Sequence, residues 1–323
     1  MGQKVSLTET FTGSGLPVVY DDSIMSAGSL ILHDVGHSLG GFSGIPGNGA
    51  SIPNVAWTTA NGLVAGAPGQ SALSSVISSS DTLVAGTTSS ATFPFTERTP
   101  KNGLHIVRSQ VNDLNGRQYL MNGASAIRDY LYNNQSHAFY FSVWQYFSRG
   151  ATTRGSPYPG IACFGINTGN GFIALQPWEI SNPSGSQQPS NTGHYIGYNC
   201  LGTLGLASSG GMGNSFWQGG VNSYVSTPPA NNIATLCMPY VWGGSGGPFN
   251  AYPHAGFSSV FYRCYLEDLT VSAMAGGYAA ANTISVSARF AEVAARDLAL
   301  YTAAIANGGR FYDDTFANPN LYP

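Results

Sequence analysis

The stretch His137–Arg149, HAFYFSVWQYFSR, constrains the fold more than any other part of the chain. Its aromatic and β-branched residues favour a strand. Side chains alternate along a strand, so the stretch presents two faces. One face carries Phe139, Phe141, Val143 and Phe147, and the other carries Tyr140, Ser142, Trp144 and Tyr146. Both faces are largely apolar or aromatic. We expect a central strand with one face in a core and the other covered by loops, a neighbouring subunit or a ligand.

Charge is scarce along this chain of 323 residues. Charged residues make up 8%, against about 25% in an ordinary soluble domain. None occurs from Val35 to Ser80 or from Ile180 to Tyr262. Gly, Ser, Asn and Pro interrupt every apolar run in these stretches, which excludes a membrane span there. The sequence indicates a surface hydrated by neutral polar groups or covered by partner subunits; a loop-rich β protein with long Gly/Ser turns is compatible with either.

Several binding classes lack their sequence signals. The net charge is −3 without a basic cluster, which argues against nucleic-acid binding and a polybasic membrane site. The N-terminus lacks the apolar segment of a secretory signal. His33 and His37 have a metal-binding spacing, but Gly36, Gly40 and Gly41 oppose a helix there. We expect loop histidines, no metal and no cofactor.

The four cysteines form no CxxC pair. Cys163 and Cys264 lie in strand-like runs and are expected to be small buried side chains. Cys200 and Cys237 lie in loop-rich sequence, and whether they form a disulfide stays open.

The chain divides into four expected segments. Residues 1–28 form an N-terminal arm, 29–100 a loop-rich β or irregular region, 101–280 a β-sandwich, and 281–323 a C-terminal helix and tail. The second long strand is expected over 257–271, with Val260, Tyr262, Cys264 and Leu266 facing one way. The helix is expected over about 288–307, before Gly308-Gly309. Its apolar stripe consists of Phe290, Val293, Ala294, Leu298, Tyr301 and Ile305. That stripe should pack on the sandwich edge or on a neighbouring chain.

Four groups of motifs carry a resemblance to a known family. They are GSLILHD with SIPNVAW, HAFYFSVWQYF, YRCYLEDLTVS, and GGRFYDDTFANP after the helix. Together they resemble tailed-bacteriophage virion proteins with concanavalin A-like or laminin-G-like jelly-roll domains. The resemblance implies a mainly β, concanavalin-like jelly-roll sandwich with an extended N-terminal arm and one C-terminal α-helix. It also implies a virion component, assembled in the host cytoplasm, that contacts other virion proteins and self-associates, as a homotrimer in our expectation. A tail-fibre, tail-tip or baseplate role and a capsid or tail decoration role both stay open.

Concanavalin-like folds include glycoside hydrolases, which need two carboxyls facing each other across a sugar. The long strands carry only Glu267 and Asp268, and neighbouring residues of a strand point to opposite faces. Glu179 stands alone, and no Gly-x-Ser-x-Gly elbow supports a serine nucleophile. We therefore expect a non-enzymatic protein, with a polysaccharide-degrading glycosidase as the third alternative.

Neutral sugars are bound by aromatic rings and uncharged hydrogen-bonding groups, and this chain has 5 Trp, 18 Tyr and 16 Phe. Candidate contacts for a host glycan or a protein partner are Tyr240, Trp242, Asn250, Tyr252, His254, Trp217 and Trp178. The alternative is that these rings fill the core or a subunit contact. Calcium is used by some proteins of this fold, but the pairs Asp21-Asp22 and Asp313-Asp314 are expected to be solvated.

Overall fold

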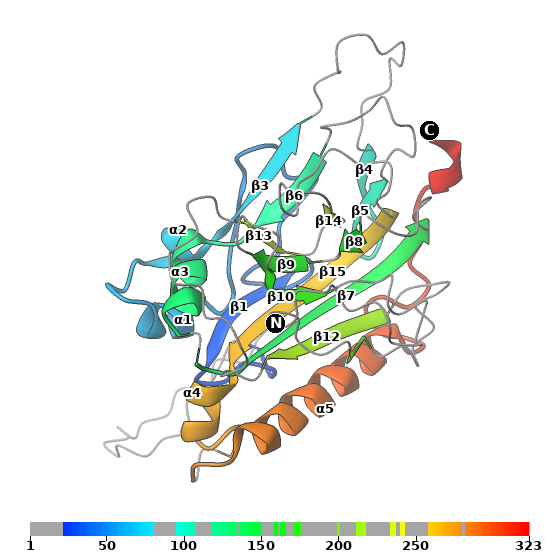
Figure 1. Ribbon diagram of the computed structural model, residues 1–323. Coiled ribbons are helices and arrows are strands. Elements are labelled where there is room, and N and C mark those ends of the chain that lie inside the picture. The colour runs from blue at the N-terminus through cyan, green and yellow to red at the C-terminus, as the bar shows by residue number, and fades with distance from the viewer. Residues whose placement is uncertain are drawn as a thin grey trace, which may run out of the picture.

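The computed structural model describes residues 22–80, 95–107, 118–134, 136–149, 258–279 and 282–322. In the rest of the chain it describes only the backbone of seven strands, over 158–160, 162–165, 171–175, 199–200, 211–217, 233–236 and 240–242. The described part is mainly β, with antiparallel sheets and a few helices, which confirms the predicted fold class at that level (Figure 1).

The larger sheet, called sheet A here, is built around the two long strands. β7 (Phe139–Arg149) pairs with β15 (Ser258–Asp268) along nearly its full length. Beyond β7 lie β12 (Gly211–Trp217) and β11 (Asn199–Cys200). Beyond β15 lie β5 (Leu104–Val107), β4 (Phe95–Arg98) and, paired with another part of β15, β1 (Ser29–Asp34). The stretch that most constrained the predicted fold therefore lies inside sheet A, as β7.

The second sheet, sheet B, packs against sheet A through a shared core. Its strands in order are β10 (Gly171–Leu175), β9 (Ala162–Gly165), β13 (Ile233–Leu236), β6 (Gln118–Asn122), β3 (Ser75–Ser80) and β2 (Ser51–Ile52). One hydrophobic cluster contains Phe141 and Leu266 of sheet A together with Ile77 and Leu120 of sheet B. A separate pair joins β14 (Tyr240–Trp242) to β8 (Tyr158–Gly160). β9 and β10 pair with each other in antiparallel register.

Helices cover two sides of the sheets. α1 (Trp57–Leu63), α2 (Gln70–Leu73) and α3 (Ser125–Asn133) lie together, away from α4 (Leu269–Met274) and α5 (Val286–Ile305) (Figure 1). α5 begins where the Ser285 hydroxyl accepts a hydrogen bond from the Ala288 amide, as expected of an N-cap. A short 3₁₀ helix, η5 (Pro319–Leu321), follows in the tail. None of the described helices is long and apolar enough to span a membrane.

α5 packs on one face of sheet A. Tyr140 and Trp144 of β7 both donate hydrogen bonds to Asp297 of α5, whereas Phe139, Phe141 and Val143 belong to the core shared with sheet B. The predicted alternation of β7 is therefore confirmed for these side chains. The face of β7 with Tyr140 and Trp144 was expected to be covered by loops, a neighbouring subunit or a ligand. That expectation is wrong where α5 covers this face. The same contacts correct the expected place of the helix, because it lies on the sheet face and not on an edge. We call the α5-facing side the outer face of sheet A.

A bulge in β15 changes which residues share a face. Val260 lies opposite Tyr146 and Cys264 lies opposite Val143, and the register shifts between Phe261 and Arg263. Tyr146 and Val143 are three residues apart on β7, so they point to opposite faces. Val260 and Cys264 therefore face opposite ways, and the prediction of a single shared face was wrong. An extra residue in one strand is the usual cause of such a switch.

The second long strand is shorter than expected because Asp268 begins a helix. Its carboxylate accepts hydrogen bonds from the Thr270 and Val271 amides at 2.9 and 3.0 Å, which caps α4. The helix predicted near the end is confirmed, but its buried face differs from the predicted stripe. Ile305 is 42% exposed, whereas Arg289 and Asp297 are fully buried.

Residues from the first two expected segments contribute to the sheets and the core. The region 29–100, expected to be loop-rich β or irregular, supplies β1 and β4 of sheet A. From the expected arm, Ile24 and Met25 are buried beside Val293 of α5 and Tyr265 of β15. The expected segment boundaries themselves stay a prediction.

Candidate functional site

The aromatic candidates lie largely beyond the described side chains. Tyr240 and Trp242 are on β14 and Trp217 ends β12, but only the backbone of these strands is described. Trp178, Asn250, Tyr252 and His254 lie outside the described residues. The backbone pairing of β14 with β8 brings Trp242 opposite Tyr158. A glycan or partner contact at these seven residues stays a prediction.

The described polar chemistry concentrates on the outer face of sheet A. Its first part joins Glu267 of β15 to Arg289 of α5 by two hydrogen bonds, of 2.6 Å from Nε and 2.9 Å from NH2. Tyr265 donates to the second Glu267 oxygen at 2.7 Å, and Ser272 donates to the first at 2.5 Å. Both charged side chains are completely buried. Each carboxylate oxygen thus receives at least two donors, as a buried charge requires.

Aromatic and charged groups complete the environment of Arg289. Its guanidinium carbon lies 3.8 Å from the centre of the Tyr278 ring, and NH1 lies 3.1 Å from Glu292. Burial acts to lower the pKa of Arg289, but the hydrogen bonds and charge of Glu267 overcome it and raise that pKa. Arg289 therefore stays charged, and its role here is to hold α5 against β15.

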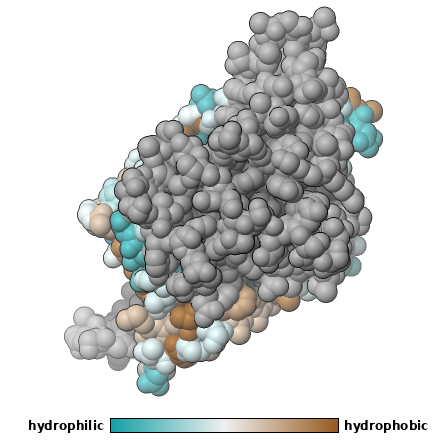
Figure 2. All heavy atoms as spheres, viewed as in Figure 1, coloured by the Kyte–Doolittle hydropathy of each residue, from teal (hydrophilic) through white to brown (hydrophobic). Residues whose placement is uncertain are grey.

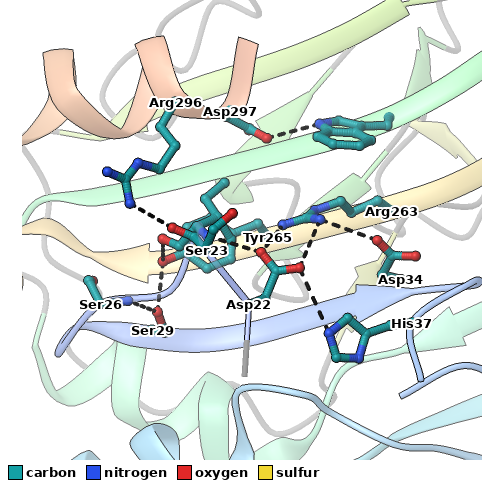
Figure 3. Close-up of polar contacts among 12 residues, drawn as sticks. Asp22, Ser23, Ser26, Ser29, Asp34, His37, Arg263, Tyr265, Arg296 and Asp297 are labelled. Atoms are coloured by element: carbon teal, nitrogen blue, oxygen red, sulfur yellow. Dashed lines mark hydrogen bonds and ion pairs between the residues drawn. The ribbon is translucent and has the colours of Figure 1, made fainter. Parts of the chain in front are cut away.

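A second group of charges surrounds Arg263, one strand position from Cys264 (Figure 3). Arg263 donates to Asp22 at 3.0 Å and to Asp34 at 3.2 Å, and its guanidinium carbon lies 4.7 Å from the centre of the Trp144 ring. Arg310 forms a second ion pair with Asp34. Burial acts to lower the pKa of Arg263, but Asp22, Asp34 and Asp297 raise it. Arg263 therefore joins the N-terminal segment to β1, and Asp34 of β1 in turn binds Arg310 of the C-terminal tail.

Asp297 of α5 joins this group from the helix side. It accepts from Tyr140 at 2.7 Å and from Trp144 at 3.0 Å. Burial raises the pKa of Asp297, and the charge of Arg263 opposes that shift without cancelling it. This carboxyl therefore holds its proton to a higher pH than an exposed aspartate. Asp22 shows the opposite balance: burial acts to raise its pKa, but Arg263, the Ile24 amide and His37 together lower it.

The other end of the outer face carries a relay of hydrogen-bonded side chains. His105 of β5 has Nδ1 2.7 Å from Glu97 of β4 and Nε2 2.7 Å from the Ser148 hydroxyl of β7. His105 is fully buried, and the Phe316 ring lies 4.8 Å from its ring. The Ala317 amide donates to Glu97 at 2.6 Å. The C-terminal tail thus lies over this relay.

A second serine–histidine contact joins β1 to β3. His33 has Nε2 2.6 Å from the Ser75 hydroxyl and Nδ1 2.9 Å from the Pro53 carbonyl oxygen. Burial lowers the pKa of His33 to about 4, so it is neutral at pH 7. The expectation of loop histidines is wrong for His33, which lies on a buried strand. Among the described residues, no group of three or more His, Cys, Asp and Glu side chains is arranged to hold a metal ion.

Several carboxyl groups considered in the sequence analysis form hydrogen bonds or ion pairs in the structure. Glu267 contacts α5, whereas Asp268 accepts from Tyr130 at 2.8 Å and lies 2.6 Å from His137 Nδ1, so the two point to opposite sides as alternation predicts. Asp22 and Asp314 are not simply solvated. Asp22 pairs with Arg263, and Asp314 accepts from Thr99 and Tyr262 at 2.6 and 2.7 Å. Glu179 and Asp21 lie outside the described residues.

The cysteine expectations are tested only at one position. Cys264 is a buried free thiol, as predicted. Cys163 lies on β9 and Cys200 on β11, where side chains are not described, and Cys237 lies outside the described residues. The question of a Cys200–Cys237 disulfide therefore stays open.

Comparisons with protein-family models, curated proteins and solved structures found no match. The geometry is therefore the main guide to function. The sequence reasoning missed Arg263, Arg289 and Asp297 as members of a buried network, and it missed the relay at His105. A signal for the helix residues was present: Arg289 and Asp297 share one helix face with Val293 and Tyr301 at a spacing of four.

Proposed function

We propose that the chain is a structural, non-enzymatic component of a tailed-bacteriophage virion. In this proposal sheets A and B form a concanavalin-like jelly-roll sandwich, and the protein belongs to a tail fibre, tail tip or baseplate that contacts the host surface. The motif resemblance suggests the role. The observation that carries it is the inward placement of charge, described next.

A third of the 18 charged residues in the described part of the chain are buried inside it. Six charged residues are buried in the described part, namely Asp34, Arg263, Glu267, Asp268, Arg289 and Asp297. The outward side of α5 instead carries Ala291, Ala295 and Ala299, and tan to brown spheres appear in Figure 2 along the edge where α4 and α5 lie in Figure 1. A neutral surface favours packing against other subunits and contact with uncharged glycans. It also fits self-association, which we propose to be trimeric.

The proposal is tested on the particle. Antibodies to the folded chain, applied to particles of the phage that encodes it, should decorate the tail tip or baseplate in electron micrographs. Size-exclusion chromatography with light scattering should give three copies per assembly. Absence of the chain from purified particles by mass spectrometry would contradict the proposal.

Host contact is tested separately. Binding to a glycan array should be lost in Trp242→Ala, while Trp217→Ala reports whether the second aromatic candidate contributes. Unchanged melting temperatures control for folding. A deletion phage that adsorbs normally but assembles less stable particles would instead favour the alternative role, a decoration protein that cements neighbouring subunits.

The glycosidase alternative is tested with host polysaccharide. Because Glu267 lies buried against Arg289, we expect no release of reducing sugar by the wild type. Release that is lost in Glu267→Gln would revive that alternative.

A further inference from the structure

Three polar side chains cross the outer face of sheet A beneath the C-terminal tail. His105 lies opposite Glu97 on the neighbouring strand β4 and opposite Val260 on β15. Ser148 comes from β7, on the far side of β15. The side chain of His105 therefore reaches over β15 and joins a carboxylate on one side to a hydroxyl on the other. This connectivity is not required by the structural role proposed above.

The hydrogen bonds fix the direction in which a proton can move. An ionised Glu97 can only accept, so the His105 Nδ1 atom, 2.7 Å away, carries the hydrogen. The Nε2 atom is then the acceptor for the Ser148 hydroxyl, also 2.7 Å away. A hydroxyl bonded to a base that is itself oriented by a third group is the general signature of an activated nucleophile. The Ser75–His33 contact lacks that third acid, because a backbone carbonyl takes its place.

The state of His105 suits a base at neutral pH. Burial lowers the pKa of His105 and Arg149 lowers it further, while Glu97 and Asp314 raise it without reversing the shift. The imidazole is therefore neutral at pH 7 and free to take a proton. Ser148 itself is only partly buried.

A cationic donor beside Ser148 already binds carbonyl oxygens. Arg149 NH1 donates to the carbonyl oxygens of Pro319 and Tyr322, at 2.7 and 2.8 Å. The tail thus presents carbonyl oxygens to the residue that follows Ser148 in β7. A guanidinium that binds such an oxygen can stabilise the negative charge that develops on it during acyl transfer.

We propose that Ser148 is the nucleophile of an acyl-transfer site for carboxylic esters, with His105 as base, Glu97 as positioning residue and Arg149 as carbonyl donor. The Ser148 oxygen attacks the ester carbonyl while His105 Nε2 takes the hydroxyl proton. The carbon–oxygen bond to the alcohol then breaks, and the alcohol leaves with the proton from His105. Water, deprotonated by His105, then attacks the acyl carbon. The bond from that carbon to the Ser148 oxygen breaks, Ser148 takes the proton from His105, and the carboxylic acid leaves.

The tail must move for an ester to enter. Phe316 packs on His105 and Tyr146, and Tyr322 stacks on Phe95 with 4.3 Å between ring centres. The tail leaves α5 through Gly308, whose φ of +82° favours glycine. The covered state explains why the nucleophile is compatible with a stable structural protein.

The inference is tested on the full chain with a fluorophosphonate probe and mass spectrometry. The Ser148 oxygen should displace fluoride from phosphorus and be the labelled atom. Phe316→Ala should label about tenfold faster, because it raises the population of the open tail. Ser148→Ala should lose the label. His105→Gln should be labelled at least about 100-fold more slowly than the wild type, as expected from loss of a general base.

Matched variants separate chemistry from folding. Ser259 also lies in sheet A and its buried hydroxyl has no hydrogen-bond partner, so Ser259→Ala should label like the wild type. The wild-type labelling rate should rise with pH through a midpoint below 6.5, the ordinary histidine value. In Glu97→Gln that midpoint should move lower, because the carboxylate that raises the pKa of His105 is gone. A purely structural Glu97 would not move it. Melting temperatures identify any variant that fails to fold, in which case Tyr322→Ala replaces Phe316→Ala.

The ester class is tested with p-nitrophenyl acetate, whose cleavage should depend on Ser148 in the same variants. If wild type and Phe316→Ala both fold but stay unlabelled at Ser148, the inference is overturned. Labelling at Ser75, equal labelling in folded His105→Gln, or labelling without ester cleavage would overturn it as well. None of these results bears on where the chain lies in a particle, but ester cleavage that depends on Ser148 would end the non-enzymatic part of the proposed function.

Discussion

The α5 end and the tail end of the outer face of sheet A place polar side chains in different ways. At the α5 end, Glu267 and Arg289 are both fully buried and neutralise each other through two hydrogen bonds. At the tail end, His105 is equally buried but neutral, and the tail that covers it is half-exposed at Phe316. A buried charge without its partner costs several kcal/mol, whereas a buried side chain that is neutral can lose its cover at a lower cost. The first arrangement fixes elements together, and the second leaves a group that can react.

The largest expected effect is the loss of the central ion pair. Glu267→Ala leaves the Arg289 guanidinium buried without its carboxylate, which should lower the free energy of unfolding by about 3–5 kcal/mol. Urea denaturation measures it. Glu292→Ala is the matched control, since this second Arg289 partner is 38% exposed; its cost should stay below about 1 kcal/mol. Equal effects of the two variants would show that burial does not distinguish them.

Loss of Asp297 should have the next largest effect. Asp297→Ala leaves the Tyr140 hydroxyl and the Trp144 indole without an acceptor, at a cost of about 1–3 kcal/mol for each unsatisfied group. Asp297→Asn keeps one acceptor oxygen and the side-chain volume, so it should cost less than Asp297→Ala. The same denaturation experiment compares them, and an Asn variant as unstable as Ala would refute the role of these bonds.

The pH dependence of stability should carry opposite contributions from two aspartates. Asp22 has a lowered pKa, so its contribution is present above about pH 3.9, the unfolded value, and is lost as pH falls through the folded pKa. Asp297 has a raised pKa, so stability declines as pH rises from the unfolded value through the folded one. Asp297→Asn should remove that decline. Parallel profiles for wild type and Asp297→Asn between pH 3 and roughly pH 7 would contradict the assignment.

The smallest effect is expected at the tail. Phe316→Ala removes a half-exposed ring from His105 and Tyr146, which should lower the global free energy of unfolding by roughly 1 kcal/mol or less. Cleavage near residue 316 by a protease should nevertheless become faster, because the tail opens locally. Tyr312→Ala, at a side chain 37% exposed, should leave that cleavage rate unchanged.

The sequence predicted the elements better than the contacts between them. Alternation in HAFYFSVWQYF correctly assigned both faces of β7, and the 3–4 spacing located α5. Alternation could not place the bulge at Tyr262, because one extra residue leaves no local trace in composition. The helix stripe was misassigned because charged side chains are normally exposed. Arg289 and Asp297 of α5 are buried because Glu267 and Arg263 lie opposite them on β15.

The candidate sites were predictable to a smaller extent. The relay at His105 joins residues 97, 105 and 148, and no short motif connects them. Such contacts depend on sheet order, which a single sequence does not provide. Asp314 was misjudged for the same reason, since Thr99, just after β4, and Tyr262 of β15 are distant from it in the sequence. The aromatic candidates around Trp242 stay predictions.

Native-state hydrogen exchange measures the contrast between the two ends most directly. Amides of α5 should exchange only through global unfolding, with opening free energies equal to that from urea denaturation. The Ala317 amide, which donates to Glu97, should open at least about 2 kcal/mol more easily, by a local movement of the tail. Equal protection of Ala317 and α5 would contradict the account, because the tail would then be as fixed as the helix and Ser148 would stay closed.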